Sequence, residues 1–341
     1  MKFASEINNP TLVFFNCYKK QVLSVRNELF DDLDSVSRKF GMRIREILKE
    51  KLIVNEQRPL LGELFPWIIK DLIDADENTT HKISVGWLAV YIYTLFLDEY
   101  VDNPSTLTPE SLIASSLLAK HGLLRLSKHS NNTAYEALVE KSLSISAYGQ
   151  SLDYKFQKHI TNSRKKIQYS KNKNYVIMAC AGAIAAENNK YGKFITDFTD
   201  NLLLSLQYLD DIADYEMDFN NGNITVLLNH AFVEKPDLKD MINKYSGDEI
   251  LNDLLSTGAL LRSLRKIRKL LSQSIVLLQI NVKKIENRPS FELFVSLTNH
   301  LSALITFLEK NTKRFSDLPI EKRREIIIGT KRYIPLIAQS T

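Results

Sequence analysis

The chain is poor in the residues that break helices or cross-link a fold. Its 341 residues include 11 glycines, 9 prolines and 2 cysteines. So little glycine and proline leaves few tight turns, and the alternating polar and apolar pattern of strands is nearly absent, so we expect an all-α protein. Cys17 and Cys180 have no paired spacing. This argues against a disulfide scaffold or a zinc site and fits a reducing compartment.

The sequence also lacks a long hydrophobic run and a strong excess of one charge. The longest apolar run, residues 86–97, is too short to cross a bilayer, so we expect no integral membrane segment. Residues 1–9 show no secretory signal pattern and the last residues show no lipidation motif, so we expect a cytoplasmic protein. The net charge of +5 is modest and aromatic residues are sparse among the basic ones, so we expect no nucleic acid partner.

Apolar residues recur at helical spacing along nearly the whole chain, and no repeat or linker interrupts them. We therefore predict a single domain, residues 1–341, with N-terminal helices in 1–55, a catalytic core in 56–235 and C-terminal helices in 236–341. The polar and basic residues 161–174 are predicted to form a mobile loop, and residues 76–80 a turn. Helices are expected near residues 12–51, 59–73, 86–102, 109–127, 134–160, 175–186, 193–219 and 225–232. Three or four more are expected in residues 236–332, where residues 250–283 show long helical periodicity.

An acidic stretch with the pattern D-D-x-x-D begins at Asp210 and Asp211 and ends at Asp214. Residues four apart lie on one face of a helix, so Asp210, Asp214 and Asp218 follow one stripe, where like charges repel. Such a stripe is stable if water solvates it or if a cation neutralises it. Carboxylate ligands suit Mg²⁺, and the alternative is a solvated acidic helix face.

A second acidic cluster strengthens the metal hypothesis. The apolar residues 86–97 run directly into Asp98, Glu99 and Asp102, in the pattern D-E-x-x-D. Carboxylates at the end of an apolar helix are unusual as surface decoration. Two such helices facing each other would form an acidic mouth over an apolar cavity. That arrangement suits a diphosphate with metal ions and a hydrocarbon tail.

Further short motifs accompany the two acidic ones in a fixed order. Together they resemble the trans-isoprenyl diphosphate synthase (polyprenyl synthetase) family over roughly residues 55–230. Each motif alone is weak, but their order along the chain makes the set specific. They are Arg58-Pro59-Leu60-Leu61, Gly149-Gln150 with Asp153, Lys171 ahead of the helix of Cys180, Gln207 three residues before Asp210, and Gly222-Asn223-Ile224-Thr225.

The resemblance implies a class I isoprenoid synthase fold, an all-α bundle with a central apolar cavity, that forms homodimers. Family members bind a prenyl diphosphate with about three Mg²⁺, for which Mn²⁺ can substitute, and the metal ions stabilise the diphosphate as it leaves. Carried onto this chain, the implied metal ligands are Asp98, Glu99, Asp102, Asp210 and Asp214. The implied catalytic residues are Asp98, Asp102, Asp210, Asp211 and Asp214. The residues implied to neutralise the diphosphate are Arg58, Lys171 and Lys173.

Other substrate contacts are expected on the same helices. Tyr91, Tyr93 and Thr94 precede the first acidic motif and can line the prenyl cavity, and the resemblance places Tyr93 where chain length is limited. Aromatic residues at helical spacing can equally be ordinary core, and Lys171 and Lys173 can equally lie in a solvated loop. Three polar residues on apolar helices can orient groups around the metal ions or be satisfied core residues: Gln150, Asp153 and Gln207.

The chain departs from the family where isopentenyl diphosphate is held. Asn55 replaces a lysine, Tyr91 replaces a histidine, and no arginine lies near Thr108. Each lost basic group removes a charge-assisted contact to the second diphosphate. This pattern favours a terpene synthase on a prenyltransferase scaffold. The alternatives are a chain-elongating prenyl diphosphate synthase, a prenyltransferase acting on a peptide or another acceptor, and a non-catalytic subunit.

Overall fold

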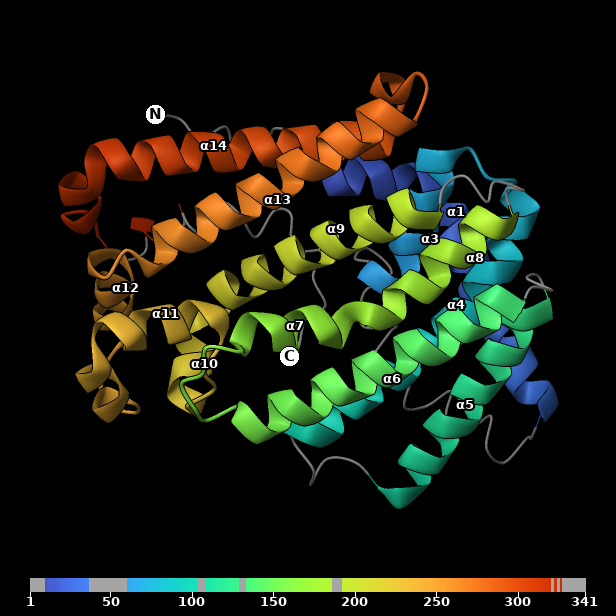
Figure 1. Cartoon of the computed structure of the whole chain (residues 1–341), viewed down its shortest axis with the longest axis horizontal. Helices are drawn as coiled ribbons and strands as arrows, with labels where there is room; N and C mark the ends of the chain where they lie inside the picture. The colour runs from blue at the N-terminus through green and yellow to red at the C-terminus, as the bar shows by residue number, and fades with distance from the viewer. Residues whose placement is uncertain are drawn as a thin grey trace. The chain divides into compact units, whose positions relative to one another are not determined.

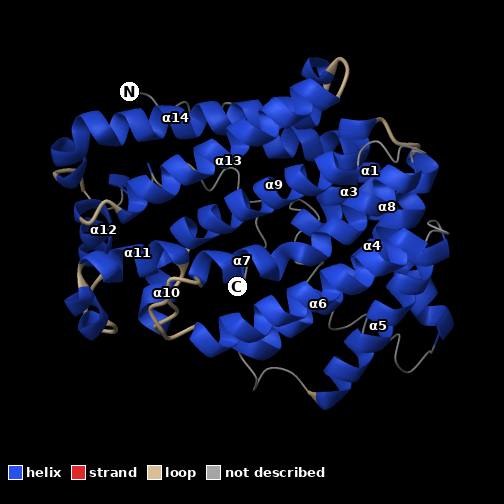
Figure 2. Cartoon of the chain, in the orientation of Figure 1, coloured by secondary structure: helices blue, strands red, loops and turns tan. Residues whose placement is uncertain are grey.

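The computed structural model describes residues 10–36, 60–102, 108–128, 133–185, 192–319, 322–323 and 326. Within these residues the regular elements are all helices, joined by turns and loops, and no strand occurs (Figure 2). The prediction of an all-α protein is confirmed. The side chains of residues 98–102, at the end of one helix, lie outside the described set.

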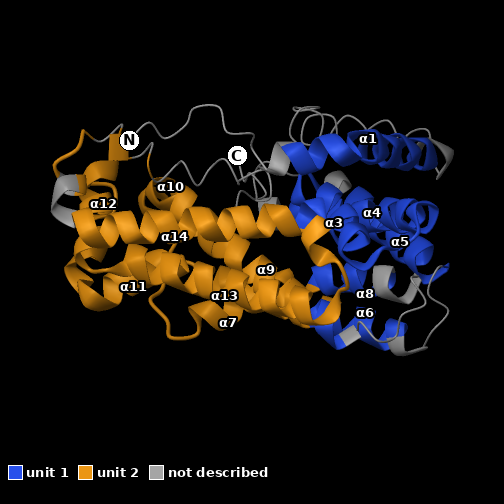
Figure 3. Ribbon diagram, turned by 90° about the horizontal axis from the view of Figure 1, so that it is seen from above, with its two compact units in different colours: residues 1–142, 174–196, 288–290 blue, residues 143–173, 197–287, 291–341 orange. Residues whose placement is uncertain are grey.

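The helices fall into two compact units (Figure 3). Unit 1 comprises residues 1–142, 174–196 and 288–290, and unit 2 comprises residues 143–173, 197–287 and 291–341. Both units take segments from distant parts of the sequence. The organisation as a single domain stays a prediction.

Unit 1 is built around α4 (Glu77–Asp102), which packs against four other helices (Figure 1). Its residues from Ile83 to Ile92 are almost all buried. This explains why the sequence between those positions is apolar on every side. The four neighbouring helices are α1 (Pro10–Val36), α3 (Leu61–Ile73), α5 (Pro109–Lys128) and α8 (Tyr175–Ala185).

The helices α4 and α5 approach each other closely in unit 1. A Cβ atom built on Gly122 would lie 2.4 Å from the backbone oxygen of Gly86, and one built on Gly86 would lie 2.9 Å from the oxygen of Gly122. Any side chain at these positions would push the two backbones apart. The two glycines therefore set the distance between the helices.

Unit 2 consists of most of α6 (Thr133–Phe156) and the helices that surround the second acidic motif. Within it, α13 lies beside α11 and α12, and α11 also contacts α7 and α10 (Figure 1). The other helices of unit 2 are α7 (Arg164–Lys171), α10 (Tyr215–Asn221), α11 (Val226–Glu234), α12 (Gly247–Ser256) and α13 (Ala259–Asn281), with α9 (Gly192–Ala213) from residue 197 and α14 (Pro289–Ser316) from residue 291.

Two features of the chain differ from the simplest sequence pattern for reasons of backbone geometry. The long helical periodicity over residues 250–283 is divided into α12 and α13 because Gly258 takes a left-handed conformation (φ 70°). The turn expected at residues 76–80 ends earlier, because the carboxylate of Asp76 accepts a hydrogen bond from the backbone of Thr79 (2.8 Å) and starts α4 at Glu77. Gly222 (φ 68°) ends α10, as the stop signal predicted.

The predicted mobile loop at residues 161–174 is also wrong. It forms α7 followed by the short 3₁₀ helix Asn172–Asn174. Arg164, Ile167 and Gln168 are buried, so this basic segment has an inner face. Lysine, arginine and glutamine are good helix formers, and the segment contains neither glycine nor proline.

One described helix is apolar enough to raise the question of a membrane span. Residues Pro289–Asn311 of α14 form a stretch of 23 residues, within which an 18-residue window has a mean hydropathy of 1.4 and is 44% buried. Leu297, Leu301 and Leu308 on its inner side are fully buried. A core helix passes the same test of length and composition, so this stretch is weak evidence for a membrane segment.

Candidate functional site

The second acidic motif lies where α9 ends and α10 begins. The predicted continuous helix 193–219 is wrong here, because Asp214 has a non-helical backbone (φ −107°, ψ 13°) and occupies the N-cap of α10. The backbone N–H of Asp214 still donates to the oxygen of Asp210, and that of Asp218 donates to the oxygen of Asp214, both at 2.9 Å. The three aspartates therefore remain on successive turns despite the break.

Asp210 carries the strongest electrostatic signature of this motif. Its side chain is partly exposed, and burial followed by the negative charges of Asp214, Asp211 and Asp218 raises its pKa well above the usual range. Lys171 acts in the opposite direction. A carboxylate that is costly to ionise among like charges becomes favourable to ionise when a cation binds beside it.

Asp211 faces inward and is 2% exposed. Its carboxylate accepts hydrogen bonds from the side chain of Gln168 (3.0 and 3.1 Å) and from the backbone N–H of Val226 at the start of α11 (2.9 Å). Burial raises the pKa of Asp211 to about 6, although these hydrogen bonds act against the increase. Asp211 therefore joins α9 to α7 and α11.

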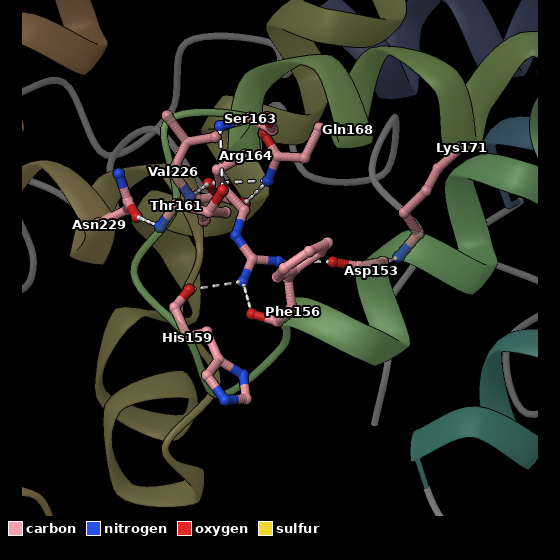
Figure 4. A network of polar contacts seen from close by, with 11 residues as sticks. Asp153, Phe156, His159, Thr161, Ser163, Arg164, Gln168, Lys171, Val226 and Asn229 are labelled. Atoms are coloured by element: carbon pink, nitrogen blue, oxygen red, sulfur yellow. Dashed lines mark hydrogen bonds and ion pairs between the residues drawn. The ribbon is translucent and has the colours of Figure 1, made fainter.

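Arg164 and Asp153 form the centre of a polar network behind the motif (Figure 4). The guanidinium of Arg164 donates to Asp153 (2.7 Å) and to the backbone oxygens of Phe156 and His159. The other oxygen of Asp153 accepts from the ammonium of Lys171 (2.6 Å). Although burial favours the neutral acid, Lys171 and Arg164 hold the pKa of Asp153 below its ordinary value.

Backbone contacts between α6 and α7 fix the position of Lys171. A Cβ atom on Gly149 would lie 2.6 Å from the backbone nitrogen of Lys171, so only glycine allows the two helices to meet there. The hydroxyl of Ser146 donates to the backbone oxygen of Lys171. In the Gly-Gln-x-x-Asp segment of α6, Gly149 thus sets the position of Lys171, and Asp153 forms an ion pair with it. Gln150 is half-buried on the same helix.

Lys173 and Gln207 have protein partners of their own. Lys173 forms an ion pair with Asp200, and its ammonium lies 4.4 Å from the centre of the Tyr169 ring. Although burial favours the neutral amine, Asp200 and Tyr169 raise the pKa of Lys173. Gln207 is half-buried one turn before Asp211, to which it contributes a hydrogen bond.

Several predicted site residues belong to unit 1 or fall outside the described residues. Asp98, Glu99 and Asp102 lie on the last turn of α4, and their side chains are outside the described set, as is the whole of Arg58. Tyr93 and Thr94 are half-buried on α4. The hydroxyl of Thr94 donates to the backbone oxygen of Tyr91 (2.7 Å).

Tyr91 lies in the aromatic core of unit 1 and is 2% exposed. Its ring centre is 6.1 Å from that of Trp87 and 5.9 Å from that of Tyr175. It also packs on the backbone of Gly62, where an added Cβ would lie 2.2 Å from the ring. The indole N–H of Trp87 donates to the oxygen of Gly62 (2.9 Å). Tyr91 therefore serves the packing of α3, α4 and α8.

Comparisons with known proteins identify the fold. No family profile and no curated protein matches the sequence. Solved structures do match, among them a polyprenyl synthase from Caulobacter crescentus complexed with calcium and isoprenyl diphosphate, with 16% identity and a TM-score of 0.69 over 84% of this chain and 96% of that one. The chain has the isoprenyl diphosphate synthase fold.

Other structures with this fold agree. A geranylgeranyl pyrophosphate synthetase from Pyrococcus horikoshii Ot3 is 15% identical, with a TM-score of 0.68 over 84% of this chain and 97% of that one. An octaprenyl pyrophosphate synthase from Helicobacter pylori is 14% identical, with a TM-score of 0.64 over 81% and 98%. The fold expected from the short motifs is thus confirmed.

In this fold, the carboxylates of the second acidic motif repel one another, and a bound cation would relieve that repulsion. Among the described residues, no group of three or more histidine, cysteine, aspartate or glutamate side chains is already arranged as a metal site. The raised pKa of Asp210 nevertheless reflects its burial and then an excess of negative charge around it. Oxygen ligands of this kind suit Mg²⁺, which keeps several waters and needs few protein ligands.

Sequence reasoning missed Arg164 and Gln168, which hold Asp153 and Asp211 in this fold. Both lie in the segment predicted to be a mobile loop. Two signals were available: the segment has no glycine or proline, and Ile167 is an apolar residue between them. Which acidic residues they contact depends on how α7 packs, and no spacing rule gives that.

Proposed function

We propose that the protein is an isoprenoid synthase that ionises an allylic prenyl diphosphate with the help of Mg²⁺. The observation that carries this proposal is the half-buried Asp210, surrounded by Asp211, Asp214 and Asp218, on the fold of the prenyl diphosphate synthases. A negative cluster of this kind accepts divalent cations, and those cations accept a diphosphate. One of the matching proteins is complexed with calcium and isoprenyl diphosphate, which supports this proposal.

Asp210 and Asp214 would hold one ion, and Asp98, Glu99 and Asp102 would hold others. When bound, Mg²⁺ neutralises charge as it develops on the departing diphosphate. Asp211 positions the motif from the inside through Gln168 and Val226. The proposal includes the identity of the metal as Mg²⁺, the number of ions, and the role of the first acidic motif as a metal ligand.

The chain's basic residues supply the rest of the diphosphate contacts. Lys171 pairs with Asp153, and its positive charge also lowers the pKa of Asp210, so it is the basic residue with the clearest link to the second acidic motif. Arg58 would add a second positively charged side chain. Lys173 would have to leave Asp200 to take part, which makes it the weakest of the three candidates.

For the acceptor, we propose isopentenyl diphosphate, which makes the protein a chain-elongating prenyl diphosphate synthase. The solved structures that share the fold are named as polyprenyl, geranylgeranyl and octaprenyl synthases. On this reading, residues other than Asn55, Tyr91 and Thr108 hold the second diphosphate. The products would be longer prenyl diphosphates.

One structural observation supports a second candidate, a terpene synthase. Tyr91 stands where the family's histidine would meet isopentenyl diphosphate, and here it is buried in an aromatic cluster. A buried phenol carries no positive charge and cannot replace a histidine at a diphosphate. An enzyme without the second diphosphate site would resolve the carbocation within its own cavity.

The two candidates give different products from the same substrates. The test is to incubate the purified protein with Mg²⁺ and geranyl, farnesyl or geranylgeranyl diphosphate, each with and without isopentenyl diphosphate. A longer diphosphate formed only with isopentenyl diphosphate supports chain elongation. A hydrocarbon or alcohol formed without it supports a terpene synthase.

A variant connects either product to the proposed site. Asp210→Asn should lower turnover by about 10²–10³, the loss typical of one group that stabilises developing charge. Asp237→Asn, at an exposed aspartate of the same unit, is the matched control. Release of no diphosphate from any substrate by the unaltered protein would reject the proposal. A homodimer in the cytoplasm is proposed with it, on the family resemblance.

A further inference from the structure

The outer side of α13 changes in character along its length. Its inner side is buried and apolar, including Leu264, Ile267 and Leu271. On the outer side, Lys269 is exposed, and Val276 and Ile280 follow it with 51% and 75% of their surfaces exposed. These three positions are seven and four residues apart, so they form one stripe about 16 Å long.

The lysines at the start of this stripe belong to a cluster that has no ion-pair partner among the described residues. Burial, and then the positive charges of Lys165 on α7 and of Lys269, lower the pKa of Lys266 on α13, so the charges of these three lysines act on one another. No described carboxylate forms an ion pair with Lys165, Lys166, Lys266 or Lys269, whereas neighbouring Arg262 and Arg265 pair with Glu234 and Glu309.

We define the basic–apolar surface as Lys165, Lys266 and Lys269 with Val276 and Ile280. All five residues belong to unit 2, on α7 and α13 (Figure 1). Lysines that repel one another are stabilised when an anion binds among them. Single exposed apolar residues need no explanation, but here two of them extend a lysine cluster along one helix.

We propose that the basic–apolar surface docks the protein reversibly onto membranes that contain anionic lipids. The lysines bind the negatively charged head groups, and Val276 and Ile280 enter the boundary of the acyl chains, which is the mode of interfacial amphipathic helices. Nucleic acid fits less well, because binding to single strands needs aromatic side chains for stacking. The exposed aromatic residue on α7, Tyr169, has its hydroxyl bonded to Asp200.

This inference goes beyond the proposed enzymatic function and does not depend on it. The test measures binding of the full-length protein to sedimented vesicles of phosphatidylcholine, with and without phosphatidylglycerol, at low and high salt. We expect binding only to vesicles with phosphatidylglycerol, and weaker binding in high salt. Equal binding to both vesicle types, or no binding at low salt, would overturn the proposal.

Paired variants separate the effect of these particular lysines on vesicle binding from the effect of the protein's net charge. Lys165→Gln/Lys269→Gln should weaken vesicle binding about 30-fold, since each lysine near an anionic surface contributes about 1 kcal/mol. Lys239→Gln/Lys244→Gln makes the same charge change on exposed lysines elsewhere in unit 2 and should leave binding unchanged. Equal losses in both pairs would mean that net charge alone drives binding, which would overturn the assignment to this surface.

A third variant tests the apolar half at constant charge. Val276→Ser/Ile280→Ser should weaken binding about tenfold, because two side chains no longer enter the acyl boundary. Both positions are exposed, so the variant should fold, and its circular dichroism melt verifies this. If the variant binds as tightly as the unaltered protein, or if single-stranded RNA competes fully with the vesicles, the surface is not a lipid-docking site.

Discussion

The side-chain nitrogen of Gln168 donates to both carboxylate oxygens of Asp211, at 3.0 and 3.1 Å. Gln168 belongs to α7 and Asp211 to the acidic motif of α9. Asp211 in turn accepts from the backbone of Val226, at the first residue of α11. One buried carboxylate therefore connects three helices around the proposed metal-binding aspartates.

Replacing Gln168 with leucine should destabilise the protein by about 1–3 kcal/mol. The variant leaves a buried carboxylate without two of its hydrogen bonds, and the cost of an unsatisfied buried acceptor is of that size. Urea unfolding at neutral pH measures the loss. Gln279→Leu, at an exposed position of α13, is the matched control and should change stability little. Equal losses in the two variants would contradict the role given to Gln168.

The stability of the protein should depend on pH through Asp211. Its pKa is raised to about 6 in the fold, against about 4 in an unfolded chain. The folded state thus binds the proton more tightly, so this contribution is present below about pH 4 and is lost as the pH rises through about 6. The expected loss is about 2–3 kcal/mol in metal-free buffer.

Asp211→Asn removes this titration while keeping an acceptor for Val226. Its free energy of unfolding should therefore fall less between pH 4 and pH 7 than that of the unaltered protein, as urea unfolding at each pH would show. Asp237→Asn, at an exposed position, should retain the full dependence. An identical pH dependence in all three proteins would refute the assignment.

Asp153→Asn should destabilise the protein most at neutral pH. The carboxylate pairs with Lys171 and with Arg164, whose side chain is 4% exposed. The pKa of Asp153 is lowered by these pairs, so its contribution is present above its unfolded pKa and is lost as the pH falls through the lowered value.

Loss of the charged hydrogen bonds to Asp153 should cost about 1.5–3 kcal/mol at pH 7. The difference from the unaltered protein should shrink in acid, where its own Asp153 becomes protonated. Asp197→Asn on α9 is the control, since no described residue forms an ion pair with Asp197. A difference that stays constant from pH 7 down to pH 2 would contradict this account.

Gly122→Ala should destabilise unit 1 by forcing α4 and α5 apart. The new methyl group would lie 2.4 Å from the backbone oxygen of Gly86 and 2.9 Å from the side chain of Ala89. Overpacking of this kind costs about 1–3 kcal/mol, measurable as a lower melting temperature. Ser116→Ala, at an exposed position of the same helix, is the control. A melting temperature unchanged by Gly122→Ala would mean that the helices can separate freely.

The helices were predictable where apolar periodicity and helix-stop signals agree. The helix at 175–186, the start of α5 at Pro109 and the end of α10 at Gly222 all follow from local residues. The break at Asp214 was not predictable, because the stripe Asp210, Asp214 and Asp218 fits a continuous helix equally well. Only the packing of α10 shows that the chain bends there.

The candidate site was predictable by residue type but not by partner. Asp210, Asp211 and Lys171 were recognised from their motifs, and the structure brings them to one region of unit 2. The structure also shows that Asp211 bonds to Gln168 and that Lys173 pairs with Asp200. These pairings depend on side-chain directions, which no spacing rule supplies. Tyr91 likewise could be cavity or core by its spacing, and its contacts with Trp87 and Tyr175 place it in the core.

The chain passes between the two compact units at residues 142, 173, 196, 287 and 290 (Figure 3). No uninterrupted stretch of the gene therefore encodes either unit. A fragment that ends at residue 142 would lack α8 and leave Trp87 and Tyr91 without Tyr175. The protein cannot be dissected into halves for separate expression, and a premature stop codon anywhere before α14 would remove part of both units.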